Sequence, residues 1–203
     1  MNPRDISDRH GDGRPGVGRL SYVVVIVLLI CSVALNVLLA RKIHFLRQIE
    51  ENLRTTGNIQ PGESVPALQA KTNDGKPVSF SYGTSETALV IYVLSPTCQW
   101  CEKNQQSVEA LASSIGKKYR FIGLSLESND LKRYLEEKNV SFPVYTEPAI
   151  TTYSSYKLGN GTPQTIVVSG QGTVLKNWHG AYSGSVKSEI EQYFGVHLPE
   201  IAQ

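Results

Sequence analysis

The apolar residues of this chain form one long uninterrupted run followed by many short ones. Residues 20–40 contain no charged side chain and consist mainly of Val, Leu and Ile. As a helix, these 21 residues would measure about 31 Å, which matches the roughly 30 Å hydrocarbon core of a bilayer. From Pro61 onward, short apolar runs alternate with turn residues, which is typical of a folded domain. The pattern therefore predicts a membrane-spanning helix followed by a globular domain.

Within the globular part, the spacing of apolar residues predicts a strand–helix–strand–helix core. Short runs rich in β-branched residues indicate buried strands, and apolar residues at every third or fourth position indicate helices. This order implies parallel strands joined by right-handed crossovers. The expected elements are a strand over Ala88–Leu94, a helix from Cys98 to Ile115, a strand over Tyr119–Leu126, and a helix that Ser128 caps and that carries Leu131, Tyr134 and Leu135 on one face.

Two hairpins and a final helix complete the expected domain. The turn residues Asn73-Asp74-Gly75 and Ser169-Gly-Gln-Gly172 each separate two strand-like runs, which is the pattern of an antiparallel hairpin. The result is an α/β domain with a mixed sheet covered by helices on both faces. The expected segments are hairpin strands over 66–68 and 76–80, hairpin strands over 164–168 and 173–178, and a closing helix that carries Val186, Ile190, Tyr193 and Phe194.

The chain is thus expected to have four parts: a disordered cytoplasmic tail (1–19), a transmembrane helix (20–40), a helical juxtamembrane stalk (41–57) and a globular domain (58–203). A cleaved signal peptide is the alternative for the apolar run, but the run is long and lacks a small-residue cleavage pattern. Arginines flank both of its ends, so charge gives little contrast in orientation. A short arginine-bearing tail favours a cytoplasmic N-terminus, which places the domain outside the cytoplasm in a single-pass cell-membrane protein.

Charge and cysteine content exclude several other classes. Residues 1–57 carry eight Lys and Arg against five Asp and Glu, whereas residues 58–203 carry twelve against thirteen. The domain is therefore near neutral and has no basic stripe that would indicate nucleic-acid binding. Three cysteines are too few for a disulfide-stapled scaffold, and with one CxxC motif and no paired histidines the chain lacks the ligands of a closed zinc site.

The candidate chemistry lies in Cys98-Gln-Trp-Cys101. This motif follows a predicted buried strand and opens a predicted helix, so Cys98 is expected at a helix N-terminus, where free N–H groups and the helix dipole favour a thiolate. A second sulfur one turn away makes a dithiol–disulfide couple. Trp100, between the two cysteines, is expected either to contact substrate or to fold over the dithiol.

The layout resembles the thioredoxin fold and, more closely, the membrane-anchored TlpA/ResA-like thiol-disulfide oxidoreductases of the Redoxin/AhpC-TSA superfamily. The likeness covers about residues 60–195. Within it, Ser95-Pro-Thr-Cys98 is similar to the corresponding turn of thioredoxin-like methylamine-utilisation proteins. The stretches that carry the resemblance are Gly62–Leu68 with Asp74–Phe80, Val90–Cys101, and Tyr156–Val168 followed by Gly172-Thr-Val and Gly180.

The resemblance implies a redox-active Cys98–Cys101 disulfide, with Cys98 as the nucleophile and Cys101 as the resolving thiol. It also implies that the Thr162–Pro163 bond is cis, faces the dithiol and contacts substrate. No cofactor and no metal are implied. The implied activity is reduction of disulfides in exported proteins, for example during cytochrome c maturation, with electrons from a membrane thiol carrier.

Two positions depart from the family pattern. Tyr92 stands where thioredoxins carry a buried acid, and Asn104 stands where the ResA-like branch carries a glutamate. Glu102 is the one carboxylate adjacent to the motif, and its side chain is expected to point elsewhere. The usual proton acceptor for the buried cysteine is therefore expected to be missing.

Two other functions remain as alternatives. A membrane-anchored copper chaperone of thioredoxin fold would use Cys98, Cys101 and a histidine, for which His179 is the candidate. A peroxidase related to the peroxiredoxins would share the fold, although their Pro and Thr stand further upstream of the reactive cysteine than Pro96 and Thr97 do here.

Overall fold

A computed structural model describes residues 17–55, 57–83, 87–116 and 118–201, in two units, Met1–Glu50 and Glu51–Gln203. The long helix α1 (Val17–Thr55) runs unbroken through the predicted span and the predicted stalk. Its segment Tyr22–Ile43 is long and apolar enough to cross a membrane. Of the predicted disordered tail, residues 1–16 lie outside the described residues, whereas residues 17–19 are helical, because extending an existing helix costs far less than starting one.

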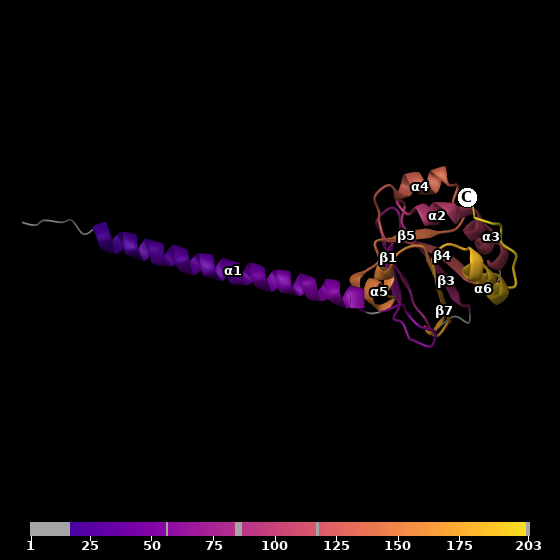
Figure 1. Ribbon diagram of the computed structural model, residues 1–203, viewed down its shortest axis with the longest axis horizontal. Coiled ribbons are helices and arrows are strands. Elements are labelled where there is room, and N and C mark those ends of the chain that lie inside the picture. The colour runs from indigo at the N-terminus through magenta and orange to yellow at the C-terminus, as the bar shows by residue number, and fades with distance from the viewer. Residues whose placement is uncertain (1–16, 56, 84–86, 117, 202–203) are drawn as a thin grey trace, which may run out of the picture. The chain divides into compact units, whose positions relative to one another are not determined.

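The domain is built on one seven-stranded sheet in the order β2-β1-β5-β4-β3-β6-β7 (Figure 1). The central strands β3, β4 and β5 are parallel, and the remaining neighbours pair antiparallel. Both predicted hairpins and the predicted parallel pair are therefore confirmed, although the first hairpin strand covers Leu68–Lys71 and not the predicted residues 66–68. The strands are β1 (Leu68–Lys71), β2 (Pro77–Phe80), β3 (Leu89–Leu94), β4 (Arg120–Ser125), β5 (Val144–Thr146), β6 (Gln164–Val168) and β7 (Val174–His179).

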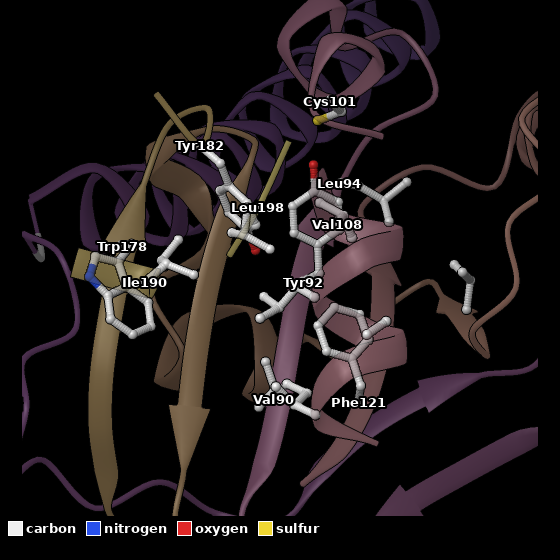
Figure 2. Close-up of a cluster of buried hydrophobic side chains, with 14 of the residues drawn as sticks. Val90, Tyr92, Leu94, Cys101, Val108, Phe121, Trp178, Tyr182, Ile190 and Leu198 are labelled. Carbon is white, nitrogen blue, oxygen red and sulfur yellow. The ribbon is translucent and has the colours of Figure 1, made fainter. Parts of the chain in front are cut away.

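The two faces of the sheet bury separate apolar clusters, and β3 contributes to both. Its side chains alternate, so that Val90, Tyr92 and Leu94 enter the cluster that contains Cys101, whereas the intervening residues enter the other (Figure 2). Helices α3, α4 and α6 supply side chains to the first cluster. The helices are α2 (Gln99–Lys103), α3 (Gln105–Ile115), α4 (Leu131–Glu137), α5 (Ile150–Ser155), the 3-10 turn η1 (Leu158–Asn160) and α6 (Gly184–Phe194).

Two local predictions were wrong, and one stretch of the chain had no predicted elements. Ser128 does not cap a helix: α4 begins at Leu131, and its N-cap residue is Asp130, in a left-handed conformation. The helix after Cys98 is not continuous, because α2 ends before Asn104 and α3 begins after it. The elements β5, α5 and η1, between residues 144 and 160, were not predicted.

Candidate active site

Cys98 lies at the point where β3 leads into α2, as the sequence predicts. It is the N-cap residue of α2, and its backbone N–H donates to the carbonyl of Ser95 at 3.1 Å. Its sulfur accepts a hydrogen bond from the backbone N–H of Cys101 at 3.1 Å. This N–H is a donor that would stabilise negative charge on the sulfur. Cys98 is half-buried, so its sulfur remains within reach of a ligand.

Cys101 occupies the opposite environment. It has no exposed surface and packs into the apolar cluster beside Tyr92, and both cysteines are free thiols in this structure (Figure 2). Burial raises the pKa of the Cys101 thiol to about 12, and the contact with Cys98 adds to the rise. Cys101 is therefore held as a neutral thiol at physiological pH.

The polar groups beneath Cys101 are uncharged. The hydroxyl of Tyr92 points toward Cys101 and accepts a hydrogen bond from Asn104 Nδ2 at 3.4 Å (Figure 2). Asn104 Oδ1 accepts from the backbone N–H of Tyr182 at 2.7 Å, and all three residues are fully buried or nearly so. Burial raises the pKa of Tyr92 well above its ordinary value. None of these groups is ready to accept a proton, which accords with the expected loss of both usual carboxylates.

Asn104 separates α2 from α3 and lies beneath the dithiol. Its backbone keeps helical hydrogen bonds, from its own N–H to the Trp100 carbonyl at 3.1 Å and from the Val108 N–H to its carbonyl at 3.0 Å. Its side-chain amide contacts β3 through Tyr92 and the chain at Tyr182. The residue thus serves the packing beneath the dithiol, a role that no local pattern in the sequence indicates.

The loop before β6 lies against Cys98. The Thr162–Pro163 peptide bond is cis, as predicted. The Cys98 thiol donates to the carbonyl of Thr162 at 3.4 Å, which places this loop directly against the nucleophile. The sequence placed these residues opposite the dithiol through the resemblance, and the contact confirms that placement. A role in binding substrate stays a prediction.

A groove of about 400 Å³ opens beside Cys98. Trp100 is 53% exposed at its edge, and its contact with substrate stays a prediction. The lining comes from the ends of β3 and β4, the start of α2, and the segments around α5 and η1: Ser95, Thr97, Cys98, Gln99, Trp100, Leu126, Glu127, Tyr153, Leu158, Gly159, Gly161 and Thr162.

Glu127 is a charged residue of the groove that no sequence motif indicated. Its carboxylate accepts a hydrogen bond from the hydroxyl of Thr97 at 3.3 Å. Leu94 at the end of β3 pairs with Ser125 at the end of β4, so the residues that follow the two strands meet at one edge. The rule that parallel strands present their carboxyl ends together was the signal that could have found it.

Glu102, the carboxylate adjacent to the motif, points away from Cys101. It forms a salt bridge with Lys138 at 2.5 Å, and that contact lowers its pKa. The expectation that its side chain lies elsewhere on the helix is confirmed.

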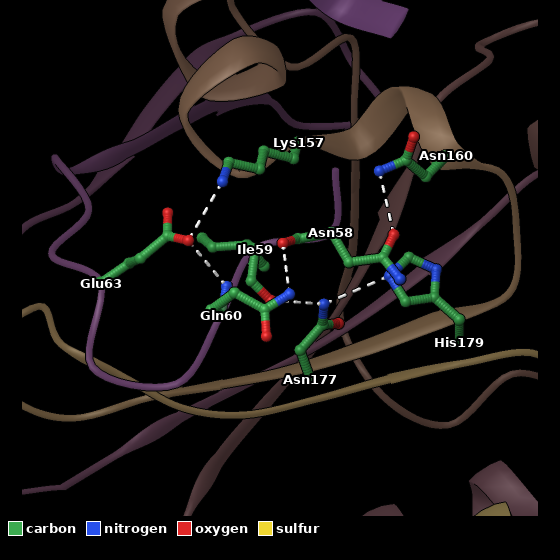
Figure 3. A network of polar contacts seen from close by, with 8 residues as sticks. All are labelled: Asn58, Ile59, Gln60, Glu63, Lys157, Asn160, Asn177 and His179. Carbon is green, nitrogen blue, oxygen red and sulfur yellow. Dashed lines mark hydrogen bonds and ion pairs between the residues drawn. The ribbon is translucent and has the colours of Figure 1, made fainter. Parts of the chain in front are cut away.

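His179 belongs to a different polar network. It lies 3.2 Å from Asn177 Nδ2, in a cluster that includes Asn58 and Asn160 (Figure 3). Burial lowers its pKa. Trp178, its neighbour on β7, packs in the cluster of Cys101, so His179 projects from the opposite face of the sheet. Within the described ranges, no group of three His, Cys, Asp or Glu side chains is placed to hold a metal ion.

Comparisons with known proteins agree with this geometry. The model of the AhpC/TSA family matches residues 61–177. A search of curated proteins found no match.

Solved structures share the fold at low sequence identity. A thiol:disulfide interchange protein from Bacteroides sp. has a TM-score of 0.54 at 16% identity, covering 68% of this chain and 92% of that one. The thioredoxin domain of a thiol-disulfide oxidoreductase from Bacteroides vulgatus has a TM-score of 0.53 at 15% identity, covering 68% and 99%. StoA from Bacillus subtilis has a TM-score of 0.51 at 15% identity, covering 64% and 99%. The domain therefore has a thioredoxin-like fold.

Proposed function

This chain belongs to the AhpC/TSA family, and we propose that it is a thiol–disulfide oxidoreductase that reduces disulfides in other proteins through Cys98 and Cys101. The observation that carries the proposal is the pairing of a half-exposed sulfur, open to a groove, with a fully buried sulfur directly behind it. The first can meet a client disulfide, and the second can be reached only from the first. The names of the fold neighbours, which include disulfide interchange proteins, agree with this assignment.

The proposed reaction proceeds in two exchanges. The Cys98 thiolate attacks one sulfur of a client disulfide, forms a mixed disulfide and releases the other client sulfur as a thiolate, which takes up a proton. Cys101, once deprotonated, attacks Cys98 and forms the Cys98–Cys101 disulfide as the second client thiol leaves. Two electrons pass to the client. An external thiol reductant, proposed to be a membrane thiol carrier, must then return the protein to its dithiol form.

We further propose that α1 tethers the domain to the cell membrane, on the extracytoplasmic side. Its 22-residue segment Tyr22–Ile43 would measure about 33 Å as a helix, enough to cross the hydrocarbon core of about 30 Å. Clients would then be exported proteins whose cysteines must stay reduced, such as apocytochromes c. Fractionation of cells and protease access to the domain in intact spheroplasts test the tether and its orientation.

The activity is tested with the full chain in detergent micelles, as reduction of insulin by dithiothreitol. We expect a marked acceleration that Cys98→Ser abolishes. Cys31→Ser is the matched control, because Cys31 lies in the apolar segment of α1 and should not affect the rate. A wild-type protein that gives no acceleration, or a Cys98→Ser protein that retains it, would contradict the proposal.

The same preparations separate the alternatives. Rapid peroxide consumption that needs Cys98 but survives Cys101→Ser would indicate a peroxidase. Stoichiometric tight copper binding lost on Cys98→Ala, without insulin reduction, would indicate the copper chaperone.

A further inference from the structure

The groove beside Cys98 has an uneven distribution of charge. Among the described residues that line it, Glu127 is the one with an ionisable acidic or basic side chain other than cysteine and tyrosine. Its neighbours are hydroxyls, amides and apolar surfaces, including the exposed ring of Trp100. A client chain lying in the groove would therefore meet a single carboxylate close to the reacting sulfur.

That carboxylate has no cationic partner in the described part of the chain. The carboxylate accepts a hydrogen bond from Thr97, and the salt bridges among the described residues of the domain involve other side chains. The two charged residues directly after the CxxC motif have other partners. Glu102 is paired with Lys138, and Lys103 lies over the Trp100 ring at 5.3 Å from its centroid. Glu127 is exposed to solvent at the groove, so its carboxylate is open to contact by a bound client.

The position of Glu127 defines where a complementary charge would sit. Thr97, which bonds the carboxylate, directly precedes Cys98 in the chain. A client strand advances about 3.3–3.6 Å per residue when extended. A basic side chain one or two positions from the reacting cysteine would therefore be able to reach the carboxylate.

Building on the proposed function, we propose that Glu127 is a specificity-determining residue that selects client disulfides whose cysteine has a Lys or Arg within two positions. An exposed ion pair of this kind changes an equilibrium by about two- to fivefold, and it is screened by salt. An acidic residue at the same place in the client would be disfavoured, because two carboxylates would face each other.

The test uses the full chain in detergent and three fluorogenic peptide disulfides that differ only beside the cysteine, with Lys, Gln or Glu. We expect kcat/KM to be about two- to fivefold higher for the Lys peptide than for the Gln peptide, and lowest for the Glu peptide. Raising salt from 0.05 to about 0.5 M should reduce the differences in kcat/KM among the three peptides. Glu127→Gln keeps the shape of the side chain and should bring the three values together.

Ratios between peptides separate recognition from reactivity, because an effect of Glu127 on the Cys98 sulfur would apply to all three peptides alike. Glu136→Gln, which removes an exposed carboxylate from α4, is the matched control and should retain the full preference. Equal values for the three peptides with the wild type, or an unchanged preference in Glu127→Gln, would overturn the specificity while leaving the proposed function intact. Failure to reduce any peptide would overturn the function and this inference with it.

Discussion

Cys98 and Cys101 belong to one turn of chain but occupy contrasting surroundings. Around Cys98 the structure is open, with an exposed Trp100, hydroxyl groups and the unpaired carboxylate of Glu127. Around Cys101 it is closed, with Tyr92 and Asn104 supplying polar atoms that carry no charge. The contrast indicates that the two sulfurs have different roles. The Cys98 sulfur is accessible to a client disulfide, whereas the Cys101 sulfur stays protonated until the client is bound.

The largest effect is expected from Cys101→Ser. With the resolving sulfur removed, turnover should stop after the first exchange, and the client should stay linked to Cys98. Non-reducing gel electrophoresis followed by mass spectrometry should detect a covalent adduct that dithiothreitol releases. If the variant turns over at the wild-type rate, then Cys101 is not the group that resolves the intermediate.

In the wild type, the attack of Cys101 on the mixed disulfide should depend strongly on pH. Burial is the largest cause of the raised pKa of Cys101, and we expect Cys101 to stay buried when Cys98 is in the mixed disulfide. The reactive thiolate fraction should therefore grow about tenfold per pH unit, so resolution should be about a hundredfold faster at pH 8 than at pH 6. Rapid-mixing measurements of the release of a thiol from a preformed mixed disulfide give this profile. A flat profile over this range would show that a resident group accepts the proton.

Asn104→Asp should make the surroundings of Cys101 more like those of Cys98, because it places a carboxylate beneath the buried thiol. The side chain keeps the acceptor for the Tyr182 N–H, and Tyr92 can donate to it. Resolution at pH 7 should quicken about tenfold, less than the ~100-fold of an ideally placed base because Asn104 lies a turn from Cys101. Gln106→Glu, which adds the same charge on the exposed side of α3, is the control and should leave the rate unchanged.

The smallest effect is expected from Trp100→Ala on the open side. Because its ring is 53% exposed, its loss should change the free energy of unfolding by less than about 0.5 kcal/mol. KM for protein clients should rise a few fold, because the binding free energy of about one aromatic contact is lost. Thermal unfolding and insulin-reduction kinetics measure the two quantities. A large drop in stability would mean that the ring is part of the fold and not of a client-binding surface.

More of the surroundings of Cys98 than of Cys101 could be predicted from the sequence. The alternation of apolar runs located β3, β4 and both hairpins, and the motif located Cys98 at the start of a helix. These signals are local, with periods of two or three to four residues. Segment β5 escaped because it has three residues next to Pro143, and α5 because its six residues are too few to show helical periodicity.

The features of the site that could not be predicted depend on contacts between residues that are far apart in the sequence. The side chain of Asn104 is held by Tyr182, 78 residues away, whose backbone N–H donates to it. Glu127 enters the groove because the parallel pairing of β3 with β4 brings two loops to one edge. Sequence reasoning could say that the usual carboxylates were missing, but not which residues surround the sulfurs instead.

The reduction potential of the full chain, measured by equilibration with dithiothreitol or glutathione buffers, tests the central claim most directly. If Cys98 and Cys101 form a reductase couple, the protein should titrate as one two-electron transition near the thioredoxin range of roughly −270 mV. Cys31→Ser should titrate identically. A potential near roughly −120 mV would make the protein an oxidant, and the absence of any transition between dithiol and disulfide would contradict the account altogether.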